Sequence, residues 1–243
     1  HRFTLQQKKV TVSLVGAGGN GSHMAFGLAK LHLALVALGH PGLRVAIVDP
    51  DTVSTSNVIR QLFMPQEVGR NKAICLAQRL NLLYALDFHA YPVTAASAHH
   101  VLRSTDLIIG AVDNAKARAS IKRAYQRGPS YWLDLGNRSS DGQFILGHRY
   151  RSGNFLPSVA DLYPEICRPS PDDDDTPSCS IAESLSRQEL FINPSLTQAA
   201  LNLLWRLFRH GEVDYHGGFV NLASGRVTPL PVSLAAWRRI RPI

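Results

Sequence analysis

Residues 10–21 read VTVSLVGAGGNG, a short strand rich in valine that runs directly into a glycine turn. The turn fits the pattern G-x-G-x-x-G, which joins a strand to a helix in nucleotide-binding α/β proteins. Glycine permits the tight turn and lets backbone N–H groups approach a phosphate, while the following helix presents the positive end of its dipole. Gly16, Gly18, Gly19 and Gly21 are therefore predicted to contact a phosphate-bearing ligand.

A second predicted strand, residues 43–48, ends in the acidic sequence Asp49-Pro50-Asp51. An acid at this point of the fold is typical of a ribose-binding carboxylate, although it usually follows the glycines by about 20 residues. The longer gap here predicts either a long helix from residue 21 to residue 38 or an insertion around residues 39–42. We expect Asp49 to bind the ribose.

A polar stretch follows at residues 51–61, DTVSTSNVIRQ, and Lys72 comes a short distance later. A dehydrogenase that transfers hydride has no need of two fixed cations there, whereas a site that handles phosphates does. Asn71 is predicted to cap a helix over residues 72–84. A cation in the first turn of a helix is poorly placed for the helix dipole, which favours a role for Lys72 on a bound phosphate.

The order of glycine turn, D-x-D-x-V-x-x-S-N-x-x-R-Q and lysine resembles the ThiF/MoeB family of ubiquitin-activating-type adenylyltransferases, and most closely the ThiF-like proteins of the PRTRC system. The resemblance covers nearly the whole chain and implies ATP and Mg²⁺ as cofactors. The residues that it assigns to the nucleotide are Gly16, Gly18, Gly19, Gly21, Asp49, Asp51, Ser56, Asn57, Arg60, Gln61, Lys72, Asp113 and Asn114.

Asp113 follows another predicted strand, residues 107–111. Ligands of open α/β sheets bind beyond the carboxyl ends of the strands, so Asp113 is expected at the same edge as the glycine turn and Asp49. The resemblance implies that Asp113 holds the magnesium ion. The alternative is that Asp113 only caps a helix over residues 114–127.

The fold class predicted is α/β, a Rossmann-like, doubly wound and mostly parallel sheet with an antiparallel extension and a long crossover loop. We expect one domain over residues 1–243, with a nucleotide-binding part at about 10–150, the crossover loop at about 151–192, and a C-terminal helix and strands at about 193–243. The remaining strands are expected at residues 88–94, 132–135, 143–146, 219–222 and 226–230, and a helix is expected from Asn193-Pro194 to about Gly211.

The composition limits the class of protein, its compartment and its partners. A hydrophobic content of 45% supports a real core. The longest apolar run, residues 31–38, is too short to cross a bilayer, and residues 1–9 show no apolar signal core, so a cytoplasmic protein is expected.

The net charge of +8 permits a nucleic-acid partner, but the dispersal of the basic residues does not favour one. The three cysteines form no C-x-x-C pair, unlike the zinc-binding members of the family, so no zinc is predicted.

Adenylation couples a carboxylate to ATP by attack on the α-phosphate, with pyrophosphate leaving. The carboxylate is already ionised at neutral pH, so no general base is required. We expect Arg60, Lys72 and Asp113 to act on the phosphates. The resemblance implies that the substrate is a ubiquitin-like protein with a C-terminal glycine and that a downstream conjugating protein follows. It also implies a homodimer, in which Arg2 is the candidate for an arginine shared across the interface.

Cys179 lies close to where some ThiF-like relatives place a reactive thiol, so it could take the acyl group as a thioester, although MoeB-like members adenylate without one. Three other functions stay open on the sequence alone: a tRNA-modifying enzyme that adenylates a nucleoside carboxylate, a nicotinamide-dependent enzyme of similar fold, and a catalytically silent scaffold subunit.

Overall fold

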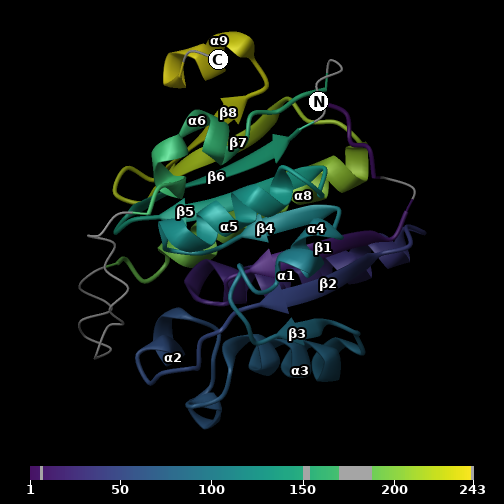
Figure 1. Ribbon diagram of the computed structural model, residues 1–243, viewed down its shortest axis with the longest axis vertical. Coiled ribbons are helices and arrows are strands. Elements are labelled where there is room, and N and C mark those ends of the chain that lie inside the picture. The colour runs from purple at the N-terminus through teal and green to yellow at the C-terminus, as the bar shows by residue number, and fades with distance from the viewer. Residues whose placement is uncertain (6–7, 150–153, 170–187, 242–243) are drawn as a thin grey trace.

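The computed structural model describes residues 1–5, 8–149, 154–169 and 188–241 (Figure 1). Its centre is an eight-stranded sheet with the strand order β3-β2-β1-β4-β5-β6-β7-β8. The strands are β1 (Val10–Val15), β2 (Leu43–Val48), β3 (His89–Tyr91), β4 (Leu107–Gly110), β5 (Tyr131–Asn137), β6 (Asp141–His148), β7 (Tyr215–Asn221) and β8 (Arg226–Pro231). Strands β1 to β5 pair in parallel, and β6, β7 and β8 extend the sheet in antiparallel fashion, which confirms the predicted fold class.

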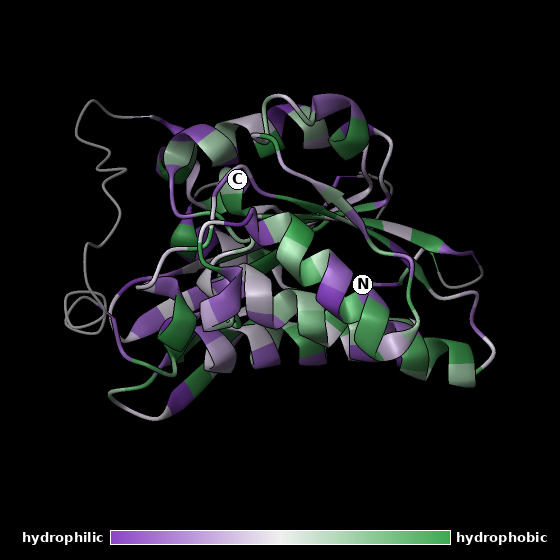
Figure 2. Ribbon diagram, turned by 90° about the horizontal axis from the view of Figure 1, so that it is seen from below, coloured by the Kyte–Doolittle hydropathy of each residue, from purple (hydrophilic) through white to green (hydrophobic). Residues whose placement is uncertain are grey.

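Helices cover both faces of this sheet (Figure 2). Helix α1 packs against α3 and α8, whereas α5 packs against α4 and the short helix η2. The helices are α1 (Gly19–Ala37), α2 (Asn57–Arg60), η1 (Pro65–Glu67), α3 (Lys72–Tyr84), α4 (His99–Arg103), α5 (Ala115–Tyr125), α6 (Val159–Leu162), η2 (Pro164–Cys167), α8 (Ile192–His210) and α9 (Leu234–Ile240).

The core follows from this layering. Strands covered on both faces read as nearly continuous apolar runs, and β4, with the sequence LIIG, is buried along its whole length. Strand β8 lies at the edge of the sheet, and only Leu230 of its residues is buried. The apolar stripe that predicted the long C-terminal helix faces inward, where Leu203 and Leu204 are fully buried.

Boundaries differ from the predictions in several places, and β5, β6 and β7 are each longer than predicted. Strand β3 is shorter than the predicted 88–94, because the amide of Val93 bonds back to the carbonyl of Tyr91 and turns the chain away. Helix α8 begins at Ile192, one residue earlier than predicted. The short helices α2, η1, α4, α6, η2 and α9 were not predicted, since each is too brief to show a clear helical period. In the described ranges, no helix is both long enough and apolar enough to cross a membrane.

Candidate active site

A cavity of about 960 Å³ opens at the edge of the sheet where β1, β2 and β4 end. Most of the predicted site residues line it: Gly16, Gly18, Gly19, Asp49, Asp51, Arg60, Gln61, Lys72, Asp113 and Asn114. Gly21, Ser56 and Asn57 are not part of its lining. Cys179 lies outside the described residues.

The glycine turn has the shape that only glycine allows. Gly16 has φ +93°, and a Cβ atom on it would lie 2.4 Å from the carbonyl oxygen of Ala111. A Cβ atom on Gly21 would lie 1.9 Å from the carbonyl oxygen of Gly16, so the first turn of α1 packs directly on the end of β1. Gly18 precedes α1 and has no side chain with which to cap it. The amino end of α1 therefore presents backbone N–H groups and a positive dipole end to an anion in the cavity.

Asp49 lies at the carboxyl end of β2 with its side chain aimed back at the glycine turn. It is 5% exposed, and its carboxylate accepts hydrogen bonds from the amides of Ala17, at 2.5 Å, and of Asp51, at 2.8 Å. Burial raises the pKa of Asp49 to about 6, and the nearby charge of Lys72 opposes that rise. Both carboxylate oxygens are thus oriented, and the ionised form is an acceptor that suits a ribose hydroxyl.

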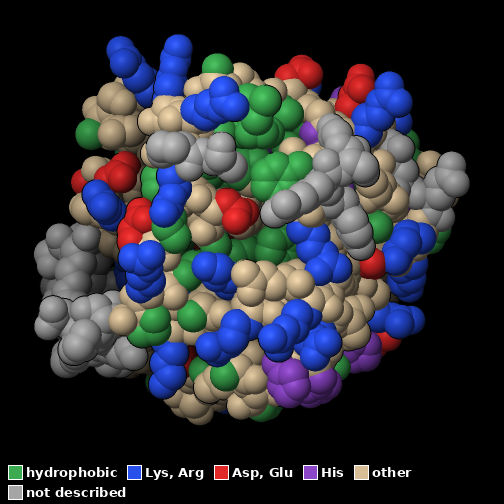
Figure 3. All heavy atoms as spheres, turned by 45° about the horizontal axis from the view of Figure 1, so that its top comes forward, with side chains coloured by type: hydrophobic (Ala, Val, Ile, Leu, Met, Phe, Trp, Pro, Cys, Tyr) green, Lys and Arg blue, Asp and Glu red, His purple; other side chains and the backbone are tan. Residues whose placement is uncertain are grey.

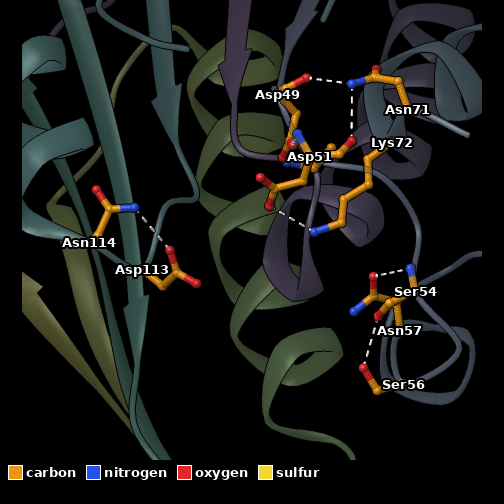
Figure 4. A network of polar contacts seen from close by, with 10 residues as sticks. Asp49, Asp51, Ser54, Ser56, Asn57, Asn71, Lys72, Asp113 and Asn114 are labelled. Carbon is orange, nitrogen blue, oxygen red and sulfur yellow. Dashed lines mark hydrogen bonds and ion pairs between the residues drawn. The ribbon is translucent and has the colours of Figure 1, made fainter. Parts of the chain in front are cut away.

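Lys72 begins α3 and forms an ion pair with Asp51, with 3.0 Å between Nζ and Oδ2. Asn71 caps the helix by accepting a bond from the amide of Ile74, as predicted, and its Nδ2 donates to the carbonyls of Asp49 and Asp51 (Figure 4). Lys72 is only 8% exposed, so most of its side chain is enclosed by the protein. Asp51 also explains how a cation is tolerated at the start of a helix.

Arg60 ends the short helix α2 and is half-buried. Its Nη1 donates to Oε1 of Gln188, and burial lowers its pKa. The side-chain oxygen of the neighbouring Gln61 is buried and has no hydrogen-bond partner in the described part of the chain. Both side chains line the cavity and offer groups to a ligand there.

Ser56 and Asn57 shape the loop that carries Arg60. The Asn57 side chain accepts a bond from the amide of Ser54 at 2.9 Å, and the hydroxyls of Ser54 and Ser56 lie 2.9 Å apart. In Figure 4 this group stands apart from Asp49, Asp51 and Lys72. The structure therefore gives these two residues a part in building the turn.

Asp113 and Asn114 follow β4 and form another part of the cavity wall (Figure 4). The cap of α5 is Asn114, whose Oδ1 accepts from the amide of Ala117 at 2.8 Å, so the alternative that Asp113 serves as the cap is wrong. Among the described residues, the exposed carboxylate of Asp113 has a single long contact, 3.4 Å, with Nδ2 of Asn114. Mg²⁺ is usually held by one or two carboxylates together with substrate phosphates and water, and an exposed carboxylate on this cavity fits that donor set.

Two residues that the sequence did not single out form an ion pair at the cavity, where Arg118 is part of the lining. Arg118 donates to the carbonyl of Val112 at 2.6 Å and lies 3.4 Å from Asp134, which is fully buried. Burial raises the pKa of Asp134, and Arg118 opposes that rise. The available signal was an aspartate inside the apolar strand β5, since a buried charge normally has a partner.

A second missed group joins the glycine turn to α8. Asn193 donates to the side-chain oxygens of Asn20, at 3.0 Å, and Asn137, at 3.2 Å, and Asn20 donates to Asn137 at 2.9 Å. Asn193 is 3% exposed, and its own oxygen has no hydrogen-bond partner among the described residues. This network is not visible from sequence spacing, because the three residues come from distant elements.

Fold and site together define an α/β protein with a nucleotide-type cavity at the carboxyl edge of its sheet. The sequence profile of the ThiF family matches residues 2–235, and the chain belongs to that family. The resemblance to the ThiF/MoeB family that the motifs indicated is thereby confirmed.

Named relatives agree with this assignment. The chain is 30% identical to a sulfur carrier protein adenylyltransferase of Thermus thermophilus over 81% of this chain and 70% of the relative. It is 29% identical to the adenylyltransferase and sulfurtransferase UBA4 of Candida albicans over 72% of this chain but 37% of the relative. The enzyme class predicted, an adenylyltransferase of the ubiquitin-activating type, is therefore confirmed.

Two solved structures share the fold. The crystal structure of PaaA matches this chain with a TM-score of 0.62 and 15% sequence identity. The match covers 93% of this chain and 65% of the PaaA chain. The crystal structure of Escherichia coli MccB matches this chain with a TM-score of 0.61 and 12% sequence identity. The match covers 94% of this chain and 64% of the MccB chain. At these identities the likeness concerns the fold alone.

Proposed function

We propose that the chain uses ATP to activate the C-terminal carboxylate of a ubiquitin-like or sulfur carrier protein as an acyl-adenylate. The observation that carries this proposal is that the glycine turn, the ribose-type acid Asp49 and the cations Arg60 and Lys72 line one cavity. The named relatives support the same class of substrate, because they include a sulfur carrier protein adenylyltransferase and ubiquitin-like modifier-activating enzymes.

In the proposed reaction, a carboxylate oxygen attacks the α-phosphorus of ATP. The new bond joins that oxygen to phosphorus, the bond to the bridging oxygen breaks, and pyrophosphate leaves with the electron pair. The backbone N–H groups at the start of α1 bind phosphate oxygens, and Asp49 orients the ribose. Arg60 and Lys72 offset the charge that shifts to the leaving group, a contribution that is large in a site shielded from water. No side chain needs to remove a proton, because the attacking group is already ionised.

Asp113 would hold a magnesium ion, which would supply further positive charge to the phosphates when it is bound. The position of its carboxylate at the cavity wall supports this role. Asn114, fixed as the cap of α5, holds the turn that presents Asp113.

The test is binding and exchange with the purified chain. We expect MgATP to bind, NAD not to bind, and a cognate carboxylate to stimulate exchange of pyrophosphate into ATP. Lys72→Met and Asp113→Asn should each slow that exchange by about a hundredfold or more while circular dichroism stays unchanged. Tight NAD binding without ATP binding at millimolar concentration would refute the proposal, and so would near-native exchange by both variants.

A second step through Cys179 stays a prediction. The two described cysteines are buried, and burial raises their pKa values, that of Cys167 to about 11, which disfavours the reactive thiolate. In the predicted step the Cys179 thiolate attacks the acyl carbon and AMP leaves. A thiol-sensitive adduct with the carrier protein that is absent in Cys179→Ala would support the step, whereas an adduct that persists in that variant would move the nucleophile elsewhere.

The likeness to PRTRC-system proteins, the downstream conjugating partner and the cytoplasmic location also stay predictions. A tRNA-modifying role would instead require salt-sensitive tRNA binding together with adenylation of a nucleoside carboxylate.

A further inference from the structure

We propose that Gln188 is a positioning residue that aims the Arg60 guanidinium at the phosphates of a bound nucleotide without cancelling its charge. This inference rests on the proposed ATP site and extends it to a residue outside the glycine turn and the acidic motifs. Gln188 lies just before α8, whereas Arg60 ends α2, 128 residues earlier in the chain. The Arg60 Nη1 group donates to the Gln188 side-chain oxygen, and both residues line the cavity.

The chemical type of this partner sets Arg60 apart from other enclosed cations of the cavity. Lys72 is held by a carboxylate at 3.0 Å, and Arg118 faces one at 3.4 Å. In the described ranges, no carboxylate lies within 4.0 Å of the Arg60 guanidinium. A carboxamide oxygen provides a directional acceptor but carries no net charge, so the attraction of Arg60 for a phosphate is kept in full.

Burial strengthens the attraction between the Arg60 guanidinium and a bound phosphate. Arg60 is half-buried, and its Nε atom is shielded from solvent and has no hydrogen-bond partner among the described residues. Charges interact more strongly where water is partly excluded. A flexible arginine fixed before the ligand arrives also loses less side-chain entropy on binding.

Gln188 is itself held in place by its neighbours along the chain. The next amide, of Glu189, donates to the carbonyl of Ser139 at 2.9 Å, at the turn between β5 and β6. Five residues further on, Asn193 is bonded to Asn20 in the glycine motif. The segment that enters α8 is thus anchored to the turn between β5 and β6 and to the glycine motif, so Gln188 has a fixed base from which to orient Arg60.

The test compares the dissociation constants of ATP and adenosine by calorimetry. Gln188→Glu would place a negative charge on the guanidinium and should weaken ATP binding about tenfold, while adenosine, which has no phosphate, binds as before. Gln188→Ala should weaken ATP binding less, by about threefold, because orientation is lost but no charge is added. In an Arg60→Ala background, most of the effect of Gln188→Glu should disappear. Gln198→Glu is the matched control, because it adds the same charge at an exposed position on α8 outside this cavity.

The outcomes separate the two proposals. If the native chain fails to bind ATP, the proposed function fails and this inference with it. If the native chain binds ATP and Gln188→Glu binds it equally well, only the role of Gln188 is overturned. Equal losses for ATP and adenosine would show a merely structural role and would overturn it too. Should Gln188→Glu not fold, Gln188→Asn, which shortens the side chain, decides by the same comparison.

Discussion

Asp49 couples the protonation of one carboxyl group to ligand binding. Its raised pKa, about 6, means that the ionised acceptor is dominant at pH 7.5 but is a minor form at pH 5. If only that form binds the ribose, adenosine affinity should be about tenfold lower at pH 5 than at pH 7.5, because about one carboxyl in ten is ionised one unit below its pKa. Calorimetry with adenosine measures this without the titration of the ATP phosphates.

Asp49→Asn provides the control for that profile. It should bind adenosine weakly at every pH, because the amide cannot accept from both backbone N–H groups and the ribose, and its affinity should not change with pH in this range. Equal adenosine affinities of the native chain at pH 5 and pH 7.5 would contradict the assignment of Asp49 to the ribose.

At the scale of elements, α8 is tied to the glycine turn by the side chain of Asn193 and, through a longer contact of 3.4 Å, by the hydroxyl of Thr197. Asn193→Ala would leave the amides of Asn20 and Asn137 with fewer partners, and we expect a loss of about 1–3 kcal/mol in the free energy of unfolding together with weaker ATP binding. Urea unfolding and calorimetry measure both. Asn202→Ala on the exposed side of the same helix is the control and should change neither quantity. Native-like ATP binding by Asn193→Ala would show that the tie does not support the turn.

The C-terminal helix α9 is held on the sheet by a histidine and a tryptophan. Trp237 Nε1 donates to Nε2 of the buried His216 at 2.8 Å, while the other ring nitrogen lies 2.7 Å from the carbonyl of Leu146. This pattern requires the neutral ring, and burial lowers the pKa of His216 to about 4. Between about pH 6.5 and 4 the unfolded chain binds the extra proton, so this contribution to stability is present above pH 6.5 and is lost as the pH falls.

His216→Gln isolates this effect, since the amide can both donate to Leu146 and accept from Trp237 but does not titrate. We expect the unfolding free energy of the native chain, relative to the variant, to fall by about 3 kcal/mol from pH 7 to pH 4. The variant is needed as a reference because Asp49, whose pKa is raised, shifts the stability in the opposite direction over nearly the same pH range. This effect of Asp49 is present in both the native chain and His216→Gln, so it cancels when their unfolding free energies are subtracted. A difference between the native chain and His216→Gln that stays constant from pH 7 to pH 4 would refute the prediction.

These elements also show how far sequence reasoning reaches. Strands β1, β2 and β4 and the motifs at their ends are local patterns, so their meeting at one edge of a parallel sheet could be predicted. Gln188 and Asn193 could not, because their roles depend on how the chain returns to the site after the crossover. The pairing of Arg118 with Asp134 could not be predicted either, because it depends on how α5 packs against the sheet, although an aspartate inside an apolar strand signals that a partner is needed. Asp113 shows the middle case: its place at the edge was foreseen, but which neighbour caps α5 depended on backbone geometry.

At the scale of the whole molecule, the net charge of +8 is spread out. On the face shown in Figure 3, Lys and Arg side chains are interspersed with acidic and apolar ones. A continuous basic stripe is the usual footprint of a nucleic-acid-binding surface, and a dispersed charge instead favours solubility. The face in Figure 3 therefore does not carry that footprint.

The predicted homodimer also belongs to the scale of the whole molecule, and the edges of the sheet limit which surfaces can form its interface. Strand β8 is an edge strand whose Pro229 and Pro231 have no N–H to donate, and prolines in edge strands place that missing donor on the open side. Pairing of two copies through β8 is therefore disfavoured, and we expect a dimer to use other surfaces. Sedimentation at micromolar concentration should give twice the mass of one chain. Val227→Lys, at a residue of β8 that is 60% exposed, should leave that mass unchanged. A monomeric native chain would refute the dimer, and a monomeric Val227→Lys variant would place the interface at β8 after all.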